Sequence, residues 1–236
     1  MPIQDINSGI PMKKTQSPTR TANLKSTKKA TREKILKAAR RVFAEHAYNA
    51  ASIRMVGKAA EIDHPLVSYY FPTKAELFEA VLEDIIEENY EASKKWYAGL
   101  DTMRTAPSLA LFLDRLMKWN RNHPYAFRVL LLNMVQAQDS ETIPGYRAIQ
   151  KIADQSAQLF KKSVQLQASD REIGIFITSF NALVINYLGA MAYYAGILGM
   201  PADDEKYENW VKETLISIFS PRLKELIRGG RSGNHQ

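Results

Sequence analysis

The stretch from residue 52 to residue 78 constrains the fold more than any other part of the chain, because it predicts two short helices with a sharp turn between them. Ser52 is a good N-cap for the first helix, and the apolar period of that helix ends at Glu61. Asp63 can cap the second helix, and Pro65 is tolerated in its first turn, where no helical N–H is needed. The pattern therefore predicts a helix, a turn and a second helix.

Two short helices joined in this way form a helix-turn-helix motif, whose second helix enters the DNA major groove. Thr73 and Glu76 follow with the T-x-x-E spacing of a capping box, which predicts a longer third helix. Residues 31–82, and above all the run YYFPTKAELF, resemble the DNA-binding domain of the TetR (tetracycline repressor) family. The resemblance implies an all-α, TetR-like protein of about nine helices. It would have an N-terminal three-helix helix-turn-helix domain and a C-terminal helical domain for ligand binding and dimerisation.

Two positions depart from the usual pattern of that family. Glu61 stands in the turn where the family usually has glycine, and a left-handed backbone there would cost a non-glycine residue about 1–2 kcal/mol. Ser68 stands where the family often has an aromatic residue. Neither residue breaks the helical pattern, but both bear on how the chain selects a DNA sequence.

The charge of the chain is concentrated near its N-terminus. Residues 1–78 hold 14 Lys and Arg against 6 Asp and Glu, whereas residues 79–236 hold 18 against 19. A basic footprint confined to one end indicates a polyanionic partner, and double-stranded DNA with an inverted-repeat operator fits the motif.

Composition argues against several other classes of protein. The chain has no cysteine, which excludes disulfides and thiolate chemistry, and its four histidines are scattered. No metal-binding motif, phosphate loop or nucleophile elbow is present, so we expect neither an enzyme nor a metal or cofactor site. The N-terminus has no apolar segment typical of a signal peptide, and we expect a cytoplasmic protein.

The chain divides into four parts on this evidence. Residues 1–30 are polar and lack an apolar period, which predicts a disordered basic tail. Residues 31–78 form the DNA-binding domain, residues 79–228 the effector-binding and dimerisation domain, and residues 229–236 a second disordered tail. We expect helices over 31–47, 73–98, 107–122, 124–137, 146–167 and 170–199, and a last helix that Asp203 or Asp204 caps and that Pro221 kinks or ends.

The span from Ile173 to Ala202 contains no charged residue and exceeds the about 20 residues that cross a bilayer. Its polar residues, its four glycines and the lack of a basic cluster beside it favour a buried helix in a soluble dimer, without a membrane. The alternative is a membrane-anchored helical DNA-binding protein that uses this span.

The motif supplies candidate DNA contacts. Side chains near the start of a recognition helix reach base edges, and an arginine in the preceding helix can bond guanine or clamp a phosphate. The resemblance points to Arg54, Tyr69 and Lys74 in particular. The complete set of expected contacts is Ser52, Arg54, His64, Pro65, Leu66, Ser68, Tyr69, Tyr70, Thr73 and Lys74.

The second domain supplies candidate ligand and dimer contacts. Aromatic residues at helical spacing are also typical of an ordinary core, but the resemblance implies a pocket for a small apolar or aromatic effector that releases a homodimeric repressor from its operator. The expected lining is Trp119, Phe127, Asn133, Met134, Phe176, Phe180 and Tyr187, with Gln136, Asn181 and Asn186 as further polar partners. Small residues recurring every seven positions predict close helix contact between subunits, and the expected dimer interface is Ala182, Gly189, Gly196, Trp210, Leu215 and Phe219.

Overall fold

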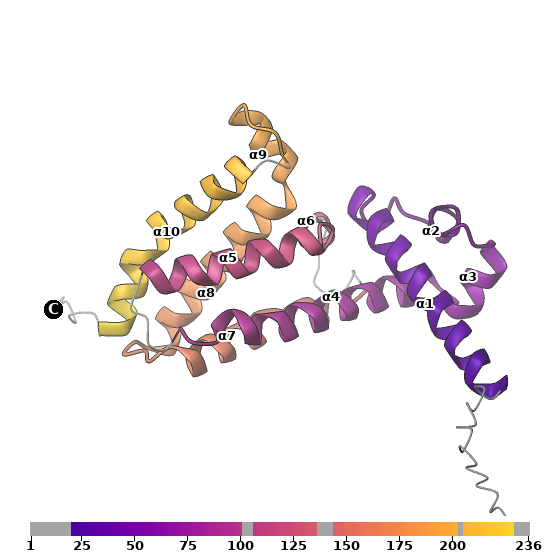
Figure 1. The fold of residues 1–236 in the computed structure, drawn as a ribbon, viewed down its shortest axis with the longest axis horizontal. Coiled ribbons are helices and arrows are strands. Elements are labelled where there is room, and N and C mark those ends of the chain that lie inside the picture. The colour runs from indigo at the N-terminus through magenta and orange to yellow at the C-terminus, as the bar shows by residue number, and fades with distance from the viewer. Residues whose placement is uncertain (1–19, 101–105, 136–143, 203–204, 229–236) are drawn as a thin grey trace, which may run out of the picture.

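The computed structural model describes residues 20–100, 106–135, 144–202 and 205–228. Within these ranges the chain forms ten α-helices and no strand, which confirms the all-α fold class (Figure 1). The N-terminal domain consists of α1 (Arg20–Glu45), α2 (Ile53–Ala60) and α3 (His64–Tyr70). The remaining helices are α4 (Lys74–Tyr97), α5 (Ala106–Asn122), α6 (Ala126–Met134), α7 (Tyr146–Ser163), α8 (Asp170–Gly189), α9 (Met191–Ile197) and α10 (Glu205–Arg228).

The first helix starts earlier than the sequence pattern predicted. We expected a helix from residue 31 and a disordered tail before it, but α1 already begins at Arg20. Thr31 lies inside α1, where its hydroxyl donates to the carbonyl of Thr27 at 3.0 Å. The turns before Thr31 have no apolar face, which is why the apolar period gave no sign of them.

A core of apolar side chains joins α1 to the helices that follow. Ile35, Ala39 and Phe43 are fully buried on the inner face of α1. The ring of Phe43 meets that of Phe78 from α4 edge-on, with centroids 4.9 Å apart. This contact fixes the start of α4 against the N-terminal domain.

The long helix α4 continues from the N-terminal domain into the second domain (Figure 1). Arg40 of α1 donates to Asp84 and to Glu88 of α4, each at 2.7 Å. His123, which follows α5, places its Nε2 3.7 Å from the same Glu88 carboxylate. Side chains of both domains thus converge on the middle of α4.

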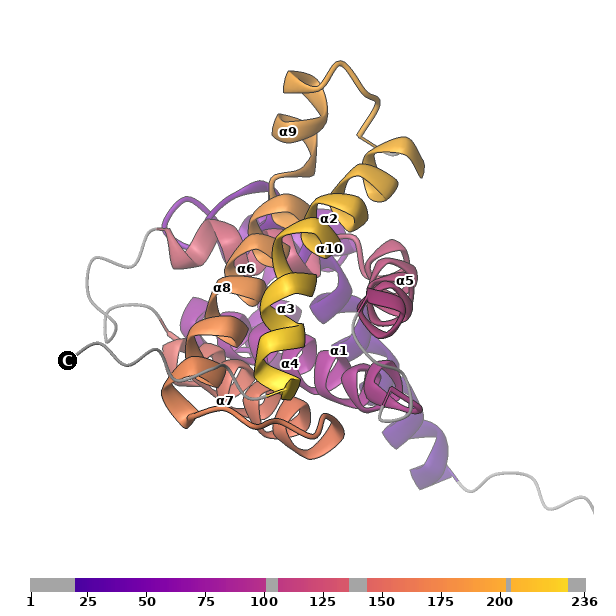
Figure 2. The same cartoon turned by 90° about the vertical axis from the view of Figure 1, so that its left-hand side faces the viewer.

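The second domain packs its helices around a common core, with α9 projecting at its edge (Figure 2). The centre of this domain is α8, which contacts α6, α7 and α10. Ser169 caps α8 through a complete capping box with Glu172, and Asp170 is the first helical residue. Helix α10 does not end at Pro221 but continues through it to Arg228.

The helix expected over residues 170–199 is broken in two, so the described part of the chain has ten helices where nine were expected. Ala190, with φ −107° and ψ 30°, ends α8 and precedes α9. Among the described helices, only α8 is long and apolar enough to cross a membrane by length and composition. It nevertheless buries Ile173, Phe176 and Val184 in the core of the domain.

Candidate nucleic-acid interface and ligand pocket

The turn between α2 and α3 has the geometry of a helix-turn-helix motif. Ser52 caps α2, and its hydroxyl accepts the N–H of Met55 at 3.3 Å. Glu61 ends α2 in the left-handed conformation, with φ 53° and ψ 46°, so the cost considered above for a non-glycine residue applies to it. A side chain at Gly57 would lie 2.8 Å from the carbonyl oxygen of Ile62, so only glycine lets α2 approach the turn this closely. The motif therefore carries backbone strain at Glu61 and a required glycine at Gly57.

Replacing Glu61 with glycine should stabilise the protein by about 1 kcal/mol, because glycine adopts the left-handed conformation without the steric cost. Thermal or urea unfolding measures this change. Glu61→Ala is the control, since alanine removes the charge but keeps the Cβ, and it should give no comparable gain. Equal stabilisation by both variants would place the effect in the charge of Glu61 and not in its backbone.

Helix α3 is fixed by one side chain and presents the others. Val67 is fully buried, whereas His64, Leu66 and Tyr69 are exposed, Tyr69 by 65%. Ser68 and Tyr70 are half-buried. Pro65 lies in the first turn as expected, while Asp63 holds the N-cap position without a side-chain hydrogen bond. The expected recognition helix thus offers a mixed apolar and polar surface to a groove.

The start of α4 lies next to this surface. The hydroxyl of Thr73 accepts the N–H of Glu76 at 3.1 Å, which confirms the expected cap. Lys74 is half-buried and donates to the carbonyls of Tyr48 and Ala51 at 2.8 and 3.1 Å. Its ammonium also lies 4.4 Å from the ring centroid of Tyr48. Since an ammonium has three N–H donors, at most one remains for the expected phosphate contact.

Sequence patterns alone missed the basic turns at the start of α1. Lys28 lies beside the recognition helix, with its Nζ 3.4 Å from the hydroxyl of Tyr69. Lys25, Lys29 and Arg32 are also exposed on this part of α1, and their spacing with Lys28 places the four on one helical face. The spacing of these cations would have revealed the face if α1 had been expected to begin before residue 31.

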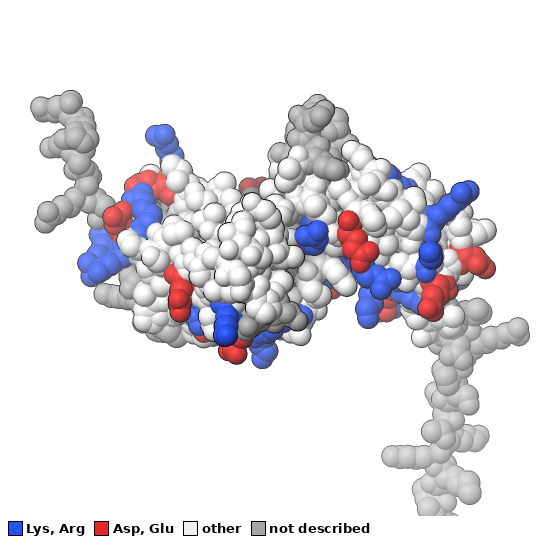
Figure 3. All heavy atoms as spheres, turned by 90° about the horizontal axis from the view of Figure 1, so that it is seen from above, with Lys and Arg blue, Asp and Glu red and all other residues white. Residues whose placement is uncertain are grey.

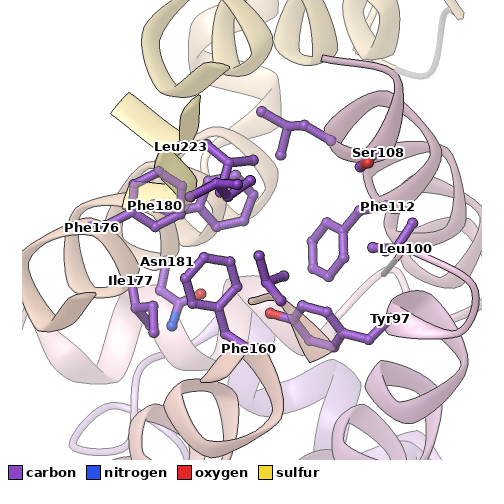
Figure 4. A pocket seen from close by; sticks show the side chains of 13 residues that line it. Tyr97, Leu100, Ser108, Phe112, Phe160, Phe176, Ile177, Phe180, Asn181 and Leu223 are labelled. Carbon is purple, nitrogen blue, oxygen red and sulfur yellow. The ribbon is translucent and has the colours of Figure 1, made fainter. Parts of the chain in front are cut away.

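The second domain contains two adjoining cavities. The α6 chamber has a volume of about 190 Å³ and includes Phe127, Leu130 and Met134 of α6 in its wall. The α10 chamber has a volume of about 50 Å³ and includes Leu223 and Ile227 near the end of α10 (Figure 4). Four residues line both chambers: Tyr97, Phe112, Phe180 and Asn181.

Four of the expected ligand contacts lie in these walls. Phe127 and Met134 line the α6 chamber, Phe176 lines the α10 chamber, and Phe180 lines both. Asn181, expected as a polar partner, also lines both. The expected cavity therefore exists, and its walls come from α4 and α10 as well as from α5 to α8.

The three other expected contacts lie outside both chambers, which corrects the prediction for them. Trp119 stacks on His123 with centroids 4.4 Å apart. Asn133 is fully buried and bonds to backbone atoms, and Tyr187 packs edge-on against Trp210 at 5.4 Å. Asn186 is also not part of either wall, and Gln136 lies outside the described residues.

The last turns of α4 supply the pocket residues that were missed. Trp96 and Tyr97 follow an acidic segment, so they do not stand out as part of a pocket in the sequence. Burial raises the pKa of the Tyr97 hydroxyl, which therefore stays protonated at neutral pH and can donate a hydrogen bond. Phe112 and Phe160 complete this aromatic wall, with their ring centroids 5.0 and 6.4 Å from that of Tyr97.

The expected dimer residues do not form one surface. Leu215 and Phe219 are buried within the chain, and Gly189 faces α6 of the same chain, because a Cβ there would lie 2.8 Å from the carbonyl oxygen of Phe127. Ala182 is exposed and lines the α6 chamber, Gly196 is exposed on α9, and Trp210 is half-buried. The seven-residue spacing joined positions that have different surroundings, because the break at Ala190 interrupts the helix.

Other apolar side chains of the last three helices are exposed. Ile175 of α8, Tyr193 and Ile197 of α9, and Ile218 of α10 each expose 48% or more of their surface. Seen from above, the surface around α9 is largely uncharged (Figure 3).

Comparison with known proteins agrees with this architecture. Residues 35–81 match the family model described as bacterial regulatory proteins, tetR family. A Bacillus subtilis (strain 168) protein described as a probable HTH-type transcriptional regulator, YttP, is 24% identical over 96 residues. These residues are 41% of this chain and 46% of that protein, so the match spans less than half of the curated relative.

Solved structures extend the likeness to most of the fold. AibR in complex with isovaleryl coenzyme A and operator DNA is 13% identical, with a TM-score of 0.58 over 81% of this chain and 98% of that chain. FadR from Bacillus subtilis in complex with stearoyl-CoA is 13% identical, with a TM-score of 0.56 over 78% of this chain and 97% of that chain. The N-terminal domain of this chain therefore matches the DNA-binding domain of the TetR family of bacterial regulatory proteins, and the fold is similar to that of solved TetR-family regulators.

Proposed function

We propose that this protein is a homodimeric, sequence-specific repressor that a small ligand releases from an inverted-repeat operator. The observation that carries the proposal is α3, a short helix anchored by Val67 that presents His64, Leu66 and Tyr69 to solvent. Arg54 of α2 is exposed beside it, and Lys28 lies next to Tyr69. Base contacts from α3 and phosphate contacts from the flanking cations are the two components of specific recognition.

Arg54→Ala should weaken binding to the operator by about 1–3 kcal/mol if Arg54 reads a base, with a smaller loss on random DNA.

Lys28→Ala should weaken binding to operator and to random DNA alike, because a phosphate contact carries no sequence information. It should also lower the slope of log affinity against log salt concentration by about 1. Fluorescence anisotropy with both duplexes over a range of salt concentrations measures these changes. Arg171→Ala is the matched control, since Arg171 is exposed on α8 in the second domain. An unchanged affinity of the Arg54 and Lys28 variants would place the DNA surface elsewhere.

The contacts of α6 support regulation by a ligand. Phe127 and Met134 of this helix line the α6 chamber. On the same helix, the Asn133 carboxamide oxygen accepts the N–H of Tyr48 at 2.9 Å, and Arg128 donates to the carbonyl of Ala44 at 2.9 Å. The partners of these two side chains are Ala44 at the end of α1 and Tyr48 in the loop that follows α1. A ligand that moves α6 therefore also moves the DNA-binding domain.

Lys74 extends this connection to the DNA surface. It bonds the carbonyl of Tyr48, whose N–H is held by Asn133 of α6. Filling the α6 chamber would therefore act on the start of α4 and on the separation of the two recognition helices in a dimer. By linkage, operator DNA weakens ligand binding by the same factor, typically about 5–150-fold, by which the ligand weakens DNA binding.

A twofold dimer places two recognition helices in successive major grooves. The exposed apolar side chains Ile175, Tyr193, Ile197 and Ile218 support a contact through α8, α9 and α10. Sedimentation of the wild-type protein at micromolar concentration tests the dimer, and Ile175→Asp should dissociate it. A wild-type monomer at that concentration would contradict the proposal.

The structures of similar fold support this proposal, and the alternative of a membrane-anchored protein fits the structure less well. AibR is solved with isovaleryl coenzyme A and operator DNA, and FadR with stearoyl-CoA, so the same architecture accommodates both DNA and a small effector. A regulator without enzymatic activity, working in the cytoplasm, fits better than a membrane-anchored protein, because α8 buries Phe176, Phe180 and Val184 against its own domain. Detergent-free extraction of the protein into the soluble fraction tests the latter choice.

A further inference from the structure

The two chambers meet at a junction that combines apolar and polar side chains. The apolar members are Phe112 and Phe180, whose ring centroids lie 5.9 Å apart. The polar members are Tyr97 of α4 and Asn181 of α8, which line both chambers. Figure 4 shows the Tyr97 hydroxyl pointing into the α10 chamber, with Asn181 entering from another wall. The junction is therefore a point where a ligand in either chamber meets hydrogen-bonding groups.

Neither polar side chain of the junction has a hydrogen-bond partner among the described residues. Tyr207 shows the contrast, because its hydroxyl donates to the carbonyl of Tyr187 at 2.8 Å. Polar groups inside proteins are normally paired, and leaving them unpaired costs free energy. Tyr97 and Asn181 are thus available to pair with a bound molecule.

The charge of the walls defines the class of that molecule. The described lining of both chambers contains no Lys, Arg, Asp or Glu. An ion placed there would lose its hydration without gaining a counter-ion, which is strongly unfavourable. The molecule that fits these walls is therefore neutral.

The volumes define its size. An apolar cavity of about 150 Å³ accommodates benzene. The α6 chamber, at about 190 Å³, accommodates one aromatic ring, whereas the α10 chamber, at about 50 Å³, accommodates only a small substituent. A one-ring molecule with a short polar substituent matches both chambers and their junction.

We propose that this pocket binds a neutral aryl carbonyl compound, with its ring in the α6 chamber and its carbonyl oxygen at the junction. A carbonyl oxygen has two lone pairs, which match two donors, the Tyr97 hydroxyl and the Asn181 amide. Only the consequence of binding, the release of DNA, rests on the proposed function. Binding of the ligand itself can be measured without DNA.

Three probes of nearly the same size separate the contribution of the carbonyl group to binding from that of the aromatic ring and from that of a charge. Acetophenone offers a neutral carbonyl, ethylbenzene offers none, and benzoate carries a charge. In NMR titrations of the full-length protein, acetophenone should bind about 2- to 10-fold more tightly than ethylbenzene for each hydrogen bond made. Benzoate should bind more weakly than either.

Variants at the junction assign the preference to their side chains. Tyr97→Phe and Asn181→Leu should each reduce the preference for acetophenone over ethylbenzene, and the double variant should abolish it. Tyr125→Phe is the matched control, because Tyr125 is an exposed tyrosine outside both chambers, and it should leave the preference unchanged. Without ligand, Tyr97→Phe should melt no lower than the wild type, since the lost hydroxyl has no partner in the described structure.

Three results would overturn the ligand class. Benzoate could bind as tightly as acetophenone, or the double variant could prefer acetophenone over ethylbenzene as strongly as the wild type does. The third is that neither acetophenone nor ethylbenzene binds. Each of these leaves the DNA-binding proposal standing if the protein still selects its operator. Conversely, acetophenone that binds at the junction but leaves operator affinity unchanged would contradict the proposed release mechanism and uphold the ligand class.

Discussion

Replacing Gly189 with alanine should destabilise the protein by about 1–3 kcal/mol, the usual cost of overpacking a well-packed core. The added Cβ would lie 2.8 Å from the carbonyl oxygen of Phe127 and 2.9 Å from the Cβ of Leu131. Neither atom belongs to the far end of a flexible side chain, so α6 and α8 would have to move apart. Urea unfolding monitored by circular dichroism measures the loss.

Gly196→Ala is the matched control for this prediction. Gly196 is exposed on α9, and a Cβ there would meet no atom within 4 Å. Alanine is favoured over glycine in a helix by about 1 kcal/mol, so this variant should be as stable as the wild type or more stable. If both variants lost the same stability, the close contact between α6 and α8 would not be the cause.

Replacing Asn133 with leucine should destabilise the protein by about 1–3 kcal/mol and reduce ligand-induced release of DNA. Leucine has a similar size but leaves the N–H of Tyr48 without the acceptor that holds it at 2.9 Å. It also removes the bond from the Asn133 amide to the carbonyl of Val129 at 2.7 Å. Thermal unfolding measures the first effect, and operator affinity with and without a pocket ligand measures the second.

Asn122→Leu provides the comparison for Asn133. Asn122 is exposed near the end of α5 and bonds the carbonyl of Lys118, one turn earlier. Its replacement should change stability by no more than about 0.5 kcal/mol and should not alter release. A pocket ligand could weaken operator binding by the same factor in the Asn133 variant as in the wild type. That result would show that α6 acts on the DNA-binding domain through other contacts.

The helix-turn-helix motif and the start of α4 could be predicted from the sequence, because their signals are local, whereas the early start of α1 at Arg20 could not. The cap at Ser52, the proline at Pro65 and the cap at Thr73 each act within one helical turn. The left-handed turn at Glu61 was considered only as a consequence of the resemblance, because the family usually has glycine there. The role of Lys74 in holding the carbonyls of Tyr48 and Ala51 was missed, because it depends on a loop more than twenty residues away.

The second domain was predicted less well, because its helices carry apolar residues on more than one side. Periodicity identified Phe127, Phe176 and Phe180 as inward-facing but could not separate pocket walls from plain core, as Trp119 shows. Small residues were equally ambiguous. Gly189 packs within the chain and Gly196 does not, although both lie on the same seven-residue repeat. Only the break at Ala190 separates them, and no proline marks it.

Specific recognition of DNA by α2 and α3 is the central claim, and one measurement tests it most directly. Duplexes selected by the wild-type protein from a random pool are compared with scrambled duplexes of the same composition at physiological salt. The selected sequences should contain an inverted repeat with half-sites about 34–36 Å apart or a multiple of that distance. They should bind at least about 10³-fold more tightly than the scrambled duplexes. The same affinity for every duplex would contradict the claim.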